Sequence, residues 1–432
     1  MSKYRLLRRL PEVSAGWYMS GGKHGQHPRY RFDDRNLECG RNVQVGMWTR
    51  RDFFASFVTR LGAGAICVRS GLSAKPETIF ESKMISAGNN YPSLNIRANR
   101  LTEICVALHL RKALASIERD LGISSAELRD RVDSLMTAGL VKSSPSGQFL
   151  PTFMVITLED AHWMAPPDEM VETTGRLIAD RLSDIRARAE SIPAIRRVGF
   201  SHSAFLILSN VLLDNWQIRN VETKFLKAER PLRNGRRYYF AIFEKQFNQQ
   251  NEAFGIFGNA GLVLGNVQLG VYGNRRYGGG TLLSVSREEF ARLFELPPQA
   301  DANAERAALL EGMVAFARTG EECLNARQKA GLTELGLFEN GELRVAVFTG
   351  AEAMKLGDVA ALITSDLLGL LERYRSELQN THERSPFSKE TTFNEFFMWW
   401  YHFFYSATTH WLARQGLLEI PRSGNATYLI AD

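Results

Sequence analysis

A pattern that occurs twice in the chain limits its fold more than any other feature of the sequence. Residues 135–157 (LMTAGLVKSSPSGQFLPTFMVIT) and 332–349 (LTELGLFENGELRVAVFT) each contain a helix end, a Gly-Leu pair, a turn with glycine and an apolar strand that ends in threonine. A short acidic segment and a long amphipathic helix follow both, over about 168–190 and about 355–379. Because self-similarity along a chain marks repeated structural units, we expect one unit to be present twice.

Each copy continues with a helix that is apolar on nearly every side. These helices are predicted over 200–216 (FSHSAFLILSNVLLDNW) and 393–409 (FNEFFMWWYHFFYSATT), and a tyrosine-containing strand follows each, at 236–243 and 425–430. A helix that is apolar all round belongs in a core. We therefore expect both helices at the centre of a pseudo-dimer formed within one chain. Whether two chains also form a homodimer stays open.

The aromatic stretch 396–404 raises the question of a membrane segment. It is shorter than the roughly 20 apolar residues that a membrane-spanning helix needs. It also contains His402, which is costly to place among lipid chains. We therefore expect this stretch to lie in a buried core, and we expect no membrane partner.

Residues 96–157 predict the structure of the first unit in more detail. Apolar residues at helical spacing indicate helices over about 97–110 and about 112–121. Ser124 and Glu127 have the spacing of a capping box, in which two side chains satisfy the free backbone donors at a helix start. This motif predicts a third helix, and two strand-like segments joined by a turn follow it.

The order helix, helix, turn, helix, hairpin resembles that of MarR-like winged helix-turn-helix regulators. The resemblance lies in 121–124 (LGIS), in Leu135 and in 138–141 (AGLV), covers about 96–157, and has a weak second copy at about 300–349. It implies that the third helix enters the major groove of double-stranded DNA and that the hairpin touches the DNA backbone. The residues that it nominates for DNA contact are Ser125, Arg129, Arg131 and Ser134 on the helix and Lys142 at the hairpin.

The charge of the third helix does not favour DNA. Glu127, Asp130 and Asp133 share the helix with Arg129 and Arg131, so three negative and two positive charges sum to −1. The hairpin turn contains no lysine or arginine, although phosphate neutralisation normally supplies a large share of the affinity for DNA. The leading hypothesis is a DNA-binding transcriptional regulator of winged-helix type. The alternative is a winged-helix scaffold that binds a protein or a ligand without DNA.

The net charge of +6 is no evidence for DNA binding, because the positive charge lies in the first 75 residues. Residues 1–75 hold 14 Lys or Arg and 5 Asp or Glu, an excess of +9, which leaves a net charge of −3 for residues 76–432. The densest basic group of the remainder lies beside Tyr238 and Tyr239, and basic residues interleaved with aromatic ones suit phosphate contact and base stacking. It is a candidate nucleic-acid or phosphate contact, with a solvated loop balanced by nearby glutamates as the alternative. This basic cluster comprises Lys224, Lys227, Arg230, Arg233, Arg236 and Arg237.

Together these patterns predict a mainly α-helical α+β protein with small β-hairpins, tandem winged-helix-like modules and an internal duplication. The expected division is a basic, disordered or dispensable region 1–83, a winged-helix domain 84–160, the rest of the first repeat 161–245, a Gly-rich β insert 246–285 and a second repeat 286–432. The insert, or the cleft between modules, is the candidate site for a small-molecule effector. Residues 49–54 (TRRDFF) resemble a twin-arginine export motif, so export stays open beside a cytoplasmic location.

Short-range motifs for catalysis or for cofactor binding are absent from the sequence. The four cysteines lie far apart without a CxxC pair, which indicates a reducing cytoplasm and neither a zinc site nor a disulfide framework. The eight histidines form no HExxH pattern, and the chain has no GxSxG and no Walker motif. We therefore expect no cofactor and no metal and nominate no catalytic residue. An enzyme whose site assembles from distant residues stays open.

Overall fold

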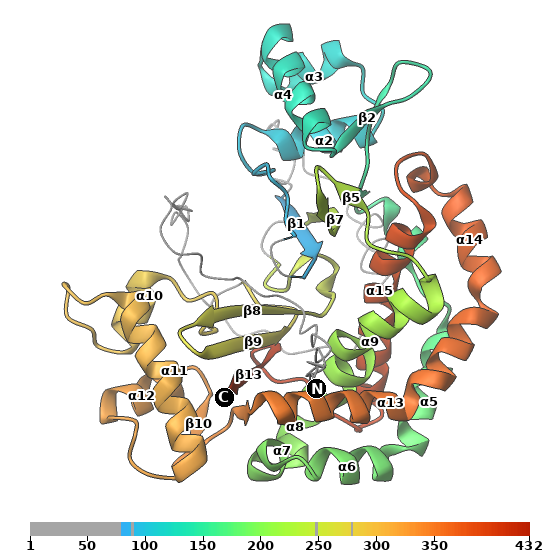
Figure 1. Cartoon of the computed structure of the whole chain (residues 1–432). Helices are drawn as coiled ribbons and strands as arrows, with labels where there is room; N and C mark the ends of the chain where they lie inside the picture. Colours follow the sequence, from blue (N-terminus) through green and yellow to red (C-terminus); the bar gives the residue numbers. More distant parts are fainter. Residues whose placement is uncertain (1–78, 88–89, 247–248, 278–279) are drawn as a thin grey trace, which may run out of the picture. The chain divides into compact units, whose positions relative to one another are not determined.

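The structure, a computed structural model, describes residues 79–87, 90–246, 249–277 and 280–432 (Figure 1). In this part of the chain, helices and small sheets combine into an α+β protein, which confirms the expected fold class at that level. The export-like motif at 49–54 and most of the region 1–83 lie outside the described residues. Buried apolar side chains form a central core and two further cores, one in each of two small modules.

The first sheet separates the core of the first module from the central core. Its strand order is β1 (Ile79–Ile85), β7 (Tyr239–Lys245), β4 (Met154–Ile156). Strand β7 is antiparallel to β1 and parallel to β4. Because successive side chains of a strand point to opposite faces, Ile242 enters the core of the first module, whereas Phe243 enters the central core.

The second sheet separates the core of the second module from the same central core. Its strand order is β12 (Ala346–Phe348), β13 (Asn425–Ala431), β9 (Val267–Gly273), β8 (Gly258–Leu264). Strand β13 is parallel to β12 and antiparallel to β9. Leu429 enters the core of the second module, whereas its neighbour Tyr428 enters the central core.

The first module contains three short helices and a hairpin, coloured blue to green in Figure 1. Its elements are α2 (Leu101–His109), α3 (Leu114–Leu121), α4 (Ser125–Thr137), β2 (Val141–Ser143) and β3 (Phe149–Pro151). The predicted capping box is confirmed. The Ser124 hydroxyl accepts a hydrogen bond from the Glu127 N–H at 3.2 Å, and the Glu127 carboxylate accepts one from the Ser124 N–H at 2.9 Å.

The second module also combines helices with a short hairpin. Its elements are α10 (Arg287–Leu293), α11 (Ala302–Thr319), α12 (Ala326–Glu334), β10 (Phe338–Glu339) and β11 (Glu342–Leu343). Helix α12 begins with a capping box of its own, formed by Asn325 and Gln328. It packs closely on the end of α10, since a Cβ atom at Gly331 would lie 2.6 Å from a ring carbon of Phe294.

Helices from both halves of the chain build the central core. The first half contributes α5 (Asp168–Asp180), α6 (Leu182–Glu190), α7 (Pro193–Val198), α8 (Phe200–Phe205), α9 (Asn215–Asn220) and the π-helical segments η2 (Leu206–Val211) and η3 (Val221–Leu226). The second half contributes α13 (Gly350–Arg373), α14 (Arg375–Arg384) and α15 (Phe393–Arg414). The shorter elements are η1 (Asp160–Met164), β5 (Leu232–Arg233), β6 (Arg236–Arg237), η4 (Ala253–Gly255) and η5 (Pro386–Lys389).

The central position predicted for the two apolar helices is confirmed. Leu208 of η2 and Trp399 of α15 are both buried in the central core. The first of the two is less regular than expected, because α8 passes into the π-helical segment η2 before α9 begins. None of the helices in the described ranges combines the length and the apolar character needed to cross a membrane.

The two long amphipathic helices are each interrupted. The predicted helix over 168–190 is divided at Arg181 into α5 and α6, and the predicted helix over 355–379 is divided at Tyr374 into α13 and α14. Both residues leave the helical backbone conformation, with ψ near zero. The apolar periodicity continues across each break, so it gave no sign of the interruption.

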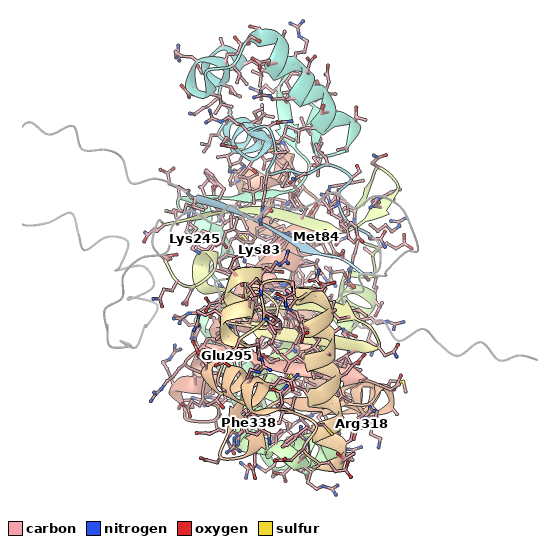
Figure 2. The ribbon with its side chains drawn as sticks, turned by 90° about the vertical axis from the view of Figure 1, so that its left-hand side faces the viewer. Lys83, Met84, Lys245, Glu295, Arg318 and Phe338 are labelled. Atoms are coloured by element: carbon pink, nitrogen blue, oxygen red, sulfur yellow. The ribbon has the colours of Figure 1, made fainter. Side chains whose placement is uncertain are left out.

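Strand β1 lies on both sides of the expected domain boundary at residue 84. Figure 2 labels Lys83 and Met84 on β1 and Lys245 on the neighbouring strand β7. The Lys83 ammonium group forms a buried ion pair with Glu252. A chain that began at Met84 would lose residues 79–83 of the strand together with this ion pair, so the structural unit starts earlier than we predicted.

The glycine-rich segment 246–285 belongs to the second sheet rather than forming a separate insert. Its hairpin provides β9, which pairs with β13 along the full length of both strands. A Cβ atom at Gly270 would lie 2.2 Å from Cζ of Tyr428, so glycine is required where this ring crosses the strand. The group that approaches the backbone closely is therefore a side chain of the same protein.

Candidate nucleic-acid interface

Helix α4 has one buried face and one solvent-exposed face. A turn of three residues, 122–124, joins it to α3, and Gly122 adopts the left-handed conformation (φ 63°) that ends α3. Leu128, Val132 and Leu135 are buried in the core of the first module, and α4 packs against α2, α3 and β2. The opposite face is open to solvent along the length of the helix, as a helix that enters a DNA groove requires.

The predicted base-contacting residues differ in their availability. Ser125 and Arg129 are exposed, and the Arg129 guanidinium has neither a hydrogen bond nor an ion pair within the described part of the chain. Arg131 lies 3.5 Å from the Glu127 carboxylate, one helical turn away. The Ser134 hydroxyl donates to the Asp130 carbonyl at 2.8 Å. Arg129 is thus the group with all its donors free for a partner.

Lys142, the predicted phosphate contact, already has a protein partner. It lies at the start of the hairpin, in β2, and its ammonium group donates to the backbone carbonyl of Glu390 at 3.1 Å. The turn of the hairpin is closed by the hydroxyls of Ser144 and Ser146, 2.9 Å apart. The hairpin therefore brings polar groups and one exposed ammonium group, which is bound to a backbone carbonyl, to the surface beside α4.

Arg233 of the basic cluster is not available for a phosphate, which corrects the prediction for this residue. Its side chain is only 4% exposed and forms an ion pair with Glu395 of α15. The same guanidinium donates to the backbone carbonyls of Tyr238, at 2.8 Å, and of Thr152. Tyr238 lies just before β7, Thr152 lies just before β4, and Glu395 lies in α15. Arg233 therefore joins the first module to the central core.

Two of the five remaining basic groups in the cluster are also neutralised by acidic residues. Arg230 forms an ion pair with Glu222 at 2.7 Å, and Arg237 forms one with Glu229 at 2.8 Å. Arg236 donates to the carbonyl of Tyr91 at 3.1 Å. Lys224 and Lys227 are exposed. The acidic partners of Arg230 and Arg237 match the alternative of a balanced solvated loop, whereas no ion pair within the described ranges neutralises Lys224 or Lys227, and the carbonyl that Arg236 binds is uncharged.

One carboxylate of the second half holds several basic groups of the first module. The Glu390 side chain accepts hydrogen bonds from His109 at 2.9 Å and from Arg111 at 2.6 Å. The other ring nitrogen of His109 lies 3.1 Å from the Asp160 carboxylate. Burial alone would lower the pKa of His109, but hydrogen bonds to Asp160 and Glu390 outweigh burial and raise this pKa to about 9. A charged histidine therefore anchors α2 at neutral pH.

Sequence reasoning did not find this anchor. His109 and Glu390 are 281 residues apart, and neither belongs to a short motif. Their separation leaves no periodic or spacing signal that a single sequence could show. The anchor matters for the candidate interface because it fixes the module that carries α4.

The described residues contain no group of three or more His, Cys, Asp or Glu side chains that could hold a metal ion. Comparisons with protein-family models, with curated proteins and with solved structures return no match. The candidate site therefore depends on the geometry of α4 and its surroundings.

Proposed function

We propose that the protein is a DNA-binding transcriptional regulator of winged-helix type and that α4 is its recognition helix. The proposal depends on the exposed guanidinium of Arg129, which lies on the solvent-exposed face of α4. The opposite face of α4 packs against α2 and α3. Arginine is the side chain that most often recognises guanine, through two parallel hydrogen bonds in the major groove. Ser125, at the start of the same face, adds a short hydroxyl that can donate or accept.

We also propose that the chain is a tandem duplication of one winged-helix-like unit. The support comes from the sheets: β7 and β13 each have one parallel and one antiparallel neighbour, and the parallel neighbour follows the hairpin of its module in both cases. Capping boxes open both α4 and α12. Both units contribute helices to the same central core, as the two halves of a pseudo-dimer do.

The second module is less suited to DNA than the first. Arg327 at the start of α12 donates to the backbone carbonyl of Glu295 at 3.3 Å. The hairpin carries Glu339 and Glu342, which lie near Arg344 at 3.4 and 3.0 Å. Acidic side chains at a hairpin tip repel phosphates. We therefore assign DNA contact to the first module alone.

A specific observation favours the second candidate, a scaffold that binds a protein without DNA. Leu110 is 48% exposed and lines a hollow of about 140 Å³ between α2 and α3, and Leu114 on α3 is 40% exposed. Val106 and Ile117 line this hollow. Exposed apolar side chains around a groove are typical of a protein-binding surface.

Selection from random genomic DNA fragments separates the two candidates. The full chain is incubated with the fragments at low and then at moderate salt, and the retained fragments are sequenced. A regulator enriches one motif that survives moderate salt. Retention that disappears with salt and enriches no motif contradicts the proposal, because non-specific phosphate contact is strongly salt-dependent.

A further inference from the structure

A buried carboxyl group lies where the two halves of the chain meet. Asp214 follows the π-helical segment η2, is 2% exposed, and belongs to no ion pair in the described ranges. Its N–H donates to the Asn210 carbonyl at 3.1 Å, so the two side chains stand one helical turn apart. π-Helical segments are rare and often accompany functional positions.

Three polar atoms of these two side chains lack a hydrogen-bond partner. Within the described part of the chain, Oδ2 of Asp214 and both Oδ1 and Nδ2 of Asn210 are buried without a hydrogen bond. Asn210 offers a donor, Nδ2, as well as an acceptor, Oδ1, so this amide is compatible with either form of the carboxyl group. The burial of Asp214 without an ion pair in the described part of the chain is what disfavours the ionised form.

The groups that face Asp214 do not supply a counter-charge. Arg276, the cation that acts on it, is committed to Glu252, with Nε 3.0 Å from the carboxylate. The remaining titratable neighbours are tyrosines whose pKa values burial raises, so they are uncharged at neutral pH. These are Tyr272 of β9, Tyr401 and Tyr405 of α15 and Tyr428 of β13.

Three of these tyrosine hydroxyls donate to other acceptors, and the Tyr405 hydroxyl also interacts with the Asp214 carboxyl group. Tyr401 donates to the Leu213 carbonyl at 2.8 Å, and Tyr405 donates to the Phe257 carbonyl at 2.7 Å. Tyr428 donates to Oδ1 of Asn259 at 3.1 Å. The side chain of Asp214 therefore lies buried among aromatic rings without an ion-pair partner in the described part of the chain, and a negative charge is costly there.

We infer that Asp214 is a proton-binding site. Its carboxyl group is protonated when the two halves of the chain are packed together. Ionisation of this group places an unpaired charge in the central core. Burial raises the pKa of Asp214 to about 7, against smaller opposing effects of the Arg276 charge and the Tyr405 hydroxyl. In an unfolded chain the pKa of an aspartate is about 3.9. Between these two values the folded protein binds more protons than the unfolded chain, so stability falls as pH rises from about 4 to about 7.

Comparison of Asp214→Asn with the wild-type full chain tests this inference. Asparagine keeps the shape and cannot ionise, and Asp184→Asn on the surface of α6 is the matched control. Urea unfolding is measured from pH 4.5 to pH 9. We compare the unfolding constant of the wild type with that of Asp214→Asn at each pH. The ratio of the two constants is expected to rise about tenfold per pH unit up to about pH 7 and then to level off. A ratio that stays constant over the whole range overturns the inference.

A second measurement covers the case in which Asp214→Asn does not fold. Infrared spectra of the wild type report the C=O stretch of protonated carboxyl groups directly. We expect such a band at pH 6 and its loss by pH 9, in a range where ordinary carboxyl groups stay ionised. Absence of the band at pH 6 overturns the inference.

Discussion

Arg233 and Glu395 form an ion pair between the first module and the central core, with side chains only 4% and 1% exposed. The carboxylate of Glu395 also accepts the Phe240 N–H of β7 at 3.1 Å. The Glu395 carboxylate on α15 thus binds both Arg233 of β5, which lies shortly before β7, and Phe240 of β7 itself. This pair lies inside the cluster that the sequence suggested as a phosphate contact, and its burial explains why that role is excluded for Arg233.

Glu395→Ala is expected to destabilise the protein strongly. It leaves the charge of Arg233 buried without its carboxylate, and breaking a buried ion pair costs about 3–5 kcal/mol. The midpoint of urea unfolding measures the effect. Glu372→Ala is the control, because it removes the exposed partner of Arg375 and should cost about 1 kcal/mol or less. Equal losses in the two variants would show that Arg233 and Glu395 do not stabilise each other.

The anchor at His109 predicts a pH dependence at the alkaline end. Its pKa of about 9 lies above the ordinary value of 6.5, so the stabilisation is complete below about pH 6.5 and is lost as pH rises through about 9. His109→Gln should therefore lower the thermal midpoint most at pH 6 and least at pH 10. His162→Gln, an exposed histidine in η1, serves as control. A difference from wild type that does not change with pH would rule out a charged His109.

Gly270 and Gly357 offer a matched pair of glycine substitutions. Gly270→Ala places a methyl group against the Tyr428 ring, and such overpacking costs about 1–3 kcal/mol. At Gly357 on α13 an added Cβ atom would meet no atom within 4 Å, and alanine favours a helix over glycine by about 0.5–1 kcal/mol. Thermal unfolding should shift down for Gly270→Ala and up for Gly357→Ala. A stable Gly270→Ala would mean that Tyr428 does not cross the strand there.

Local patterns in the sequence predicted the local structure well. The capping box at Ser124 and Glu127 and the burial of the helix around Trp399 follow from short-range spacing and from apolar character, and both are confirmed. The interruption of the long helices at Arg181 and Tyr374 was missed. The break at each point is a change of backbone angle at one residue, and apolar periodicity along one sequence does not record such a change.

Long-range contacts account for most of what sequence reasoning could not reach. Strand β1 pairs with β7, and His109 meets Glu390, across separations far longer than any motif. The boundary at residue 84 was placed inside β1 for the same reason, because its partner strand lies much later in the chain. The exposure of Arg129 could be predicted, since a charged residue on the outer face of an amphipathic helix can be identified from helical spacing alone, and its role in DNA contact stays a prediction.

The central claim is that Arg129 on α4 reads a base in DNA. The most direct measurement is the affinity of wild type, Arg129→Ala and Arg188→Ala for the motif obtained by selection, at one moderate salt concentration. Arg188 is an exposed arginine on α6, so its removal changes the net charge equally. We expect Arg129→Ala to lose about tenfold or more in affinity, as the loss of one bidentate contact to guanine does, while Arg188→Ala binds as wild type. Equal affinity of the two variants for the motif would contradict the assignment of α4 as the recognition helix.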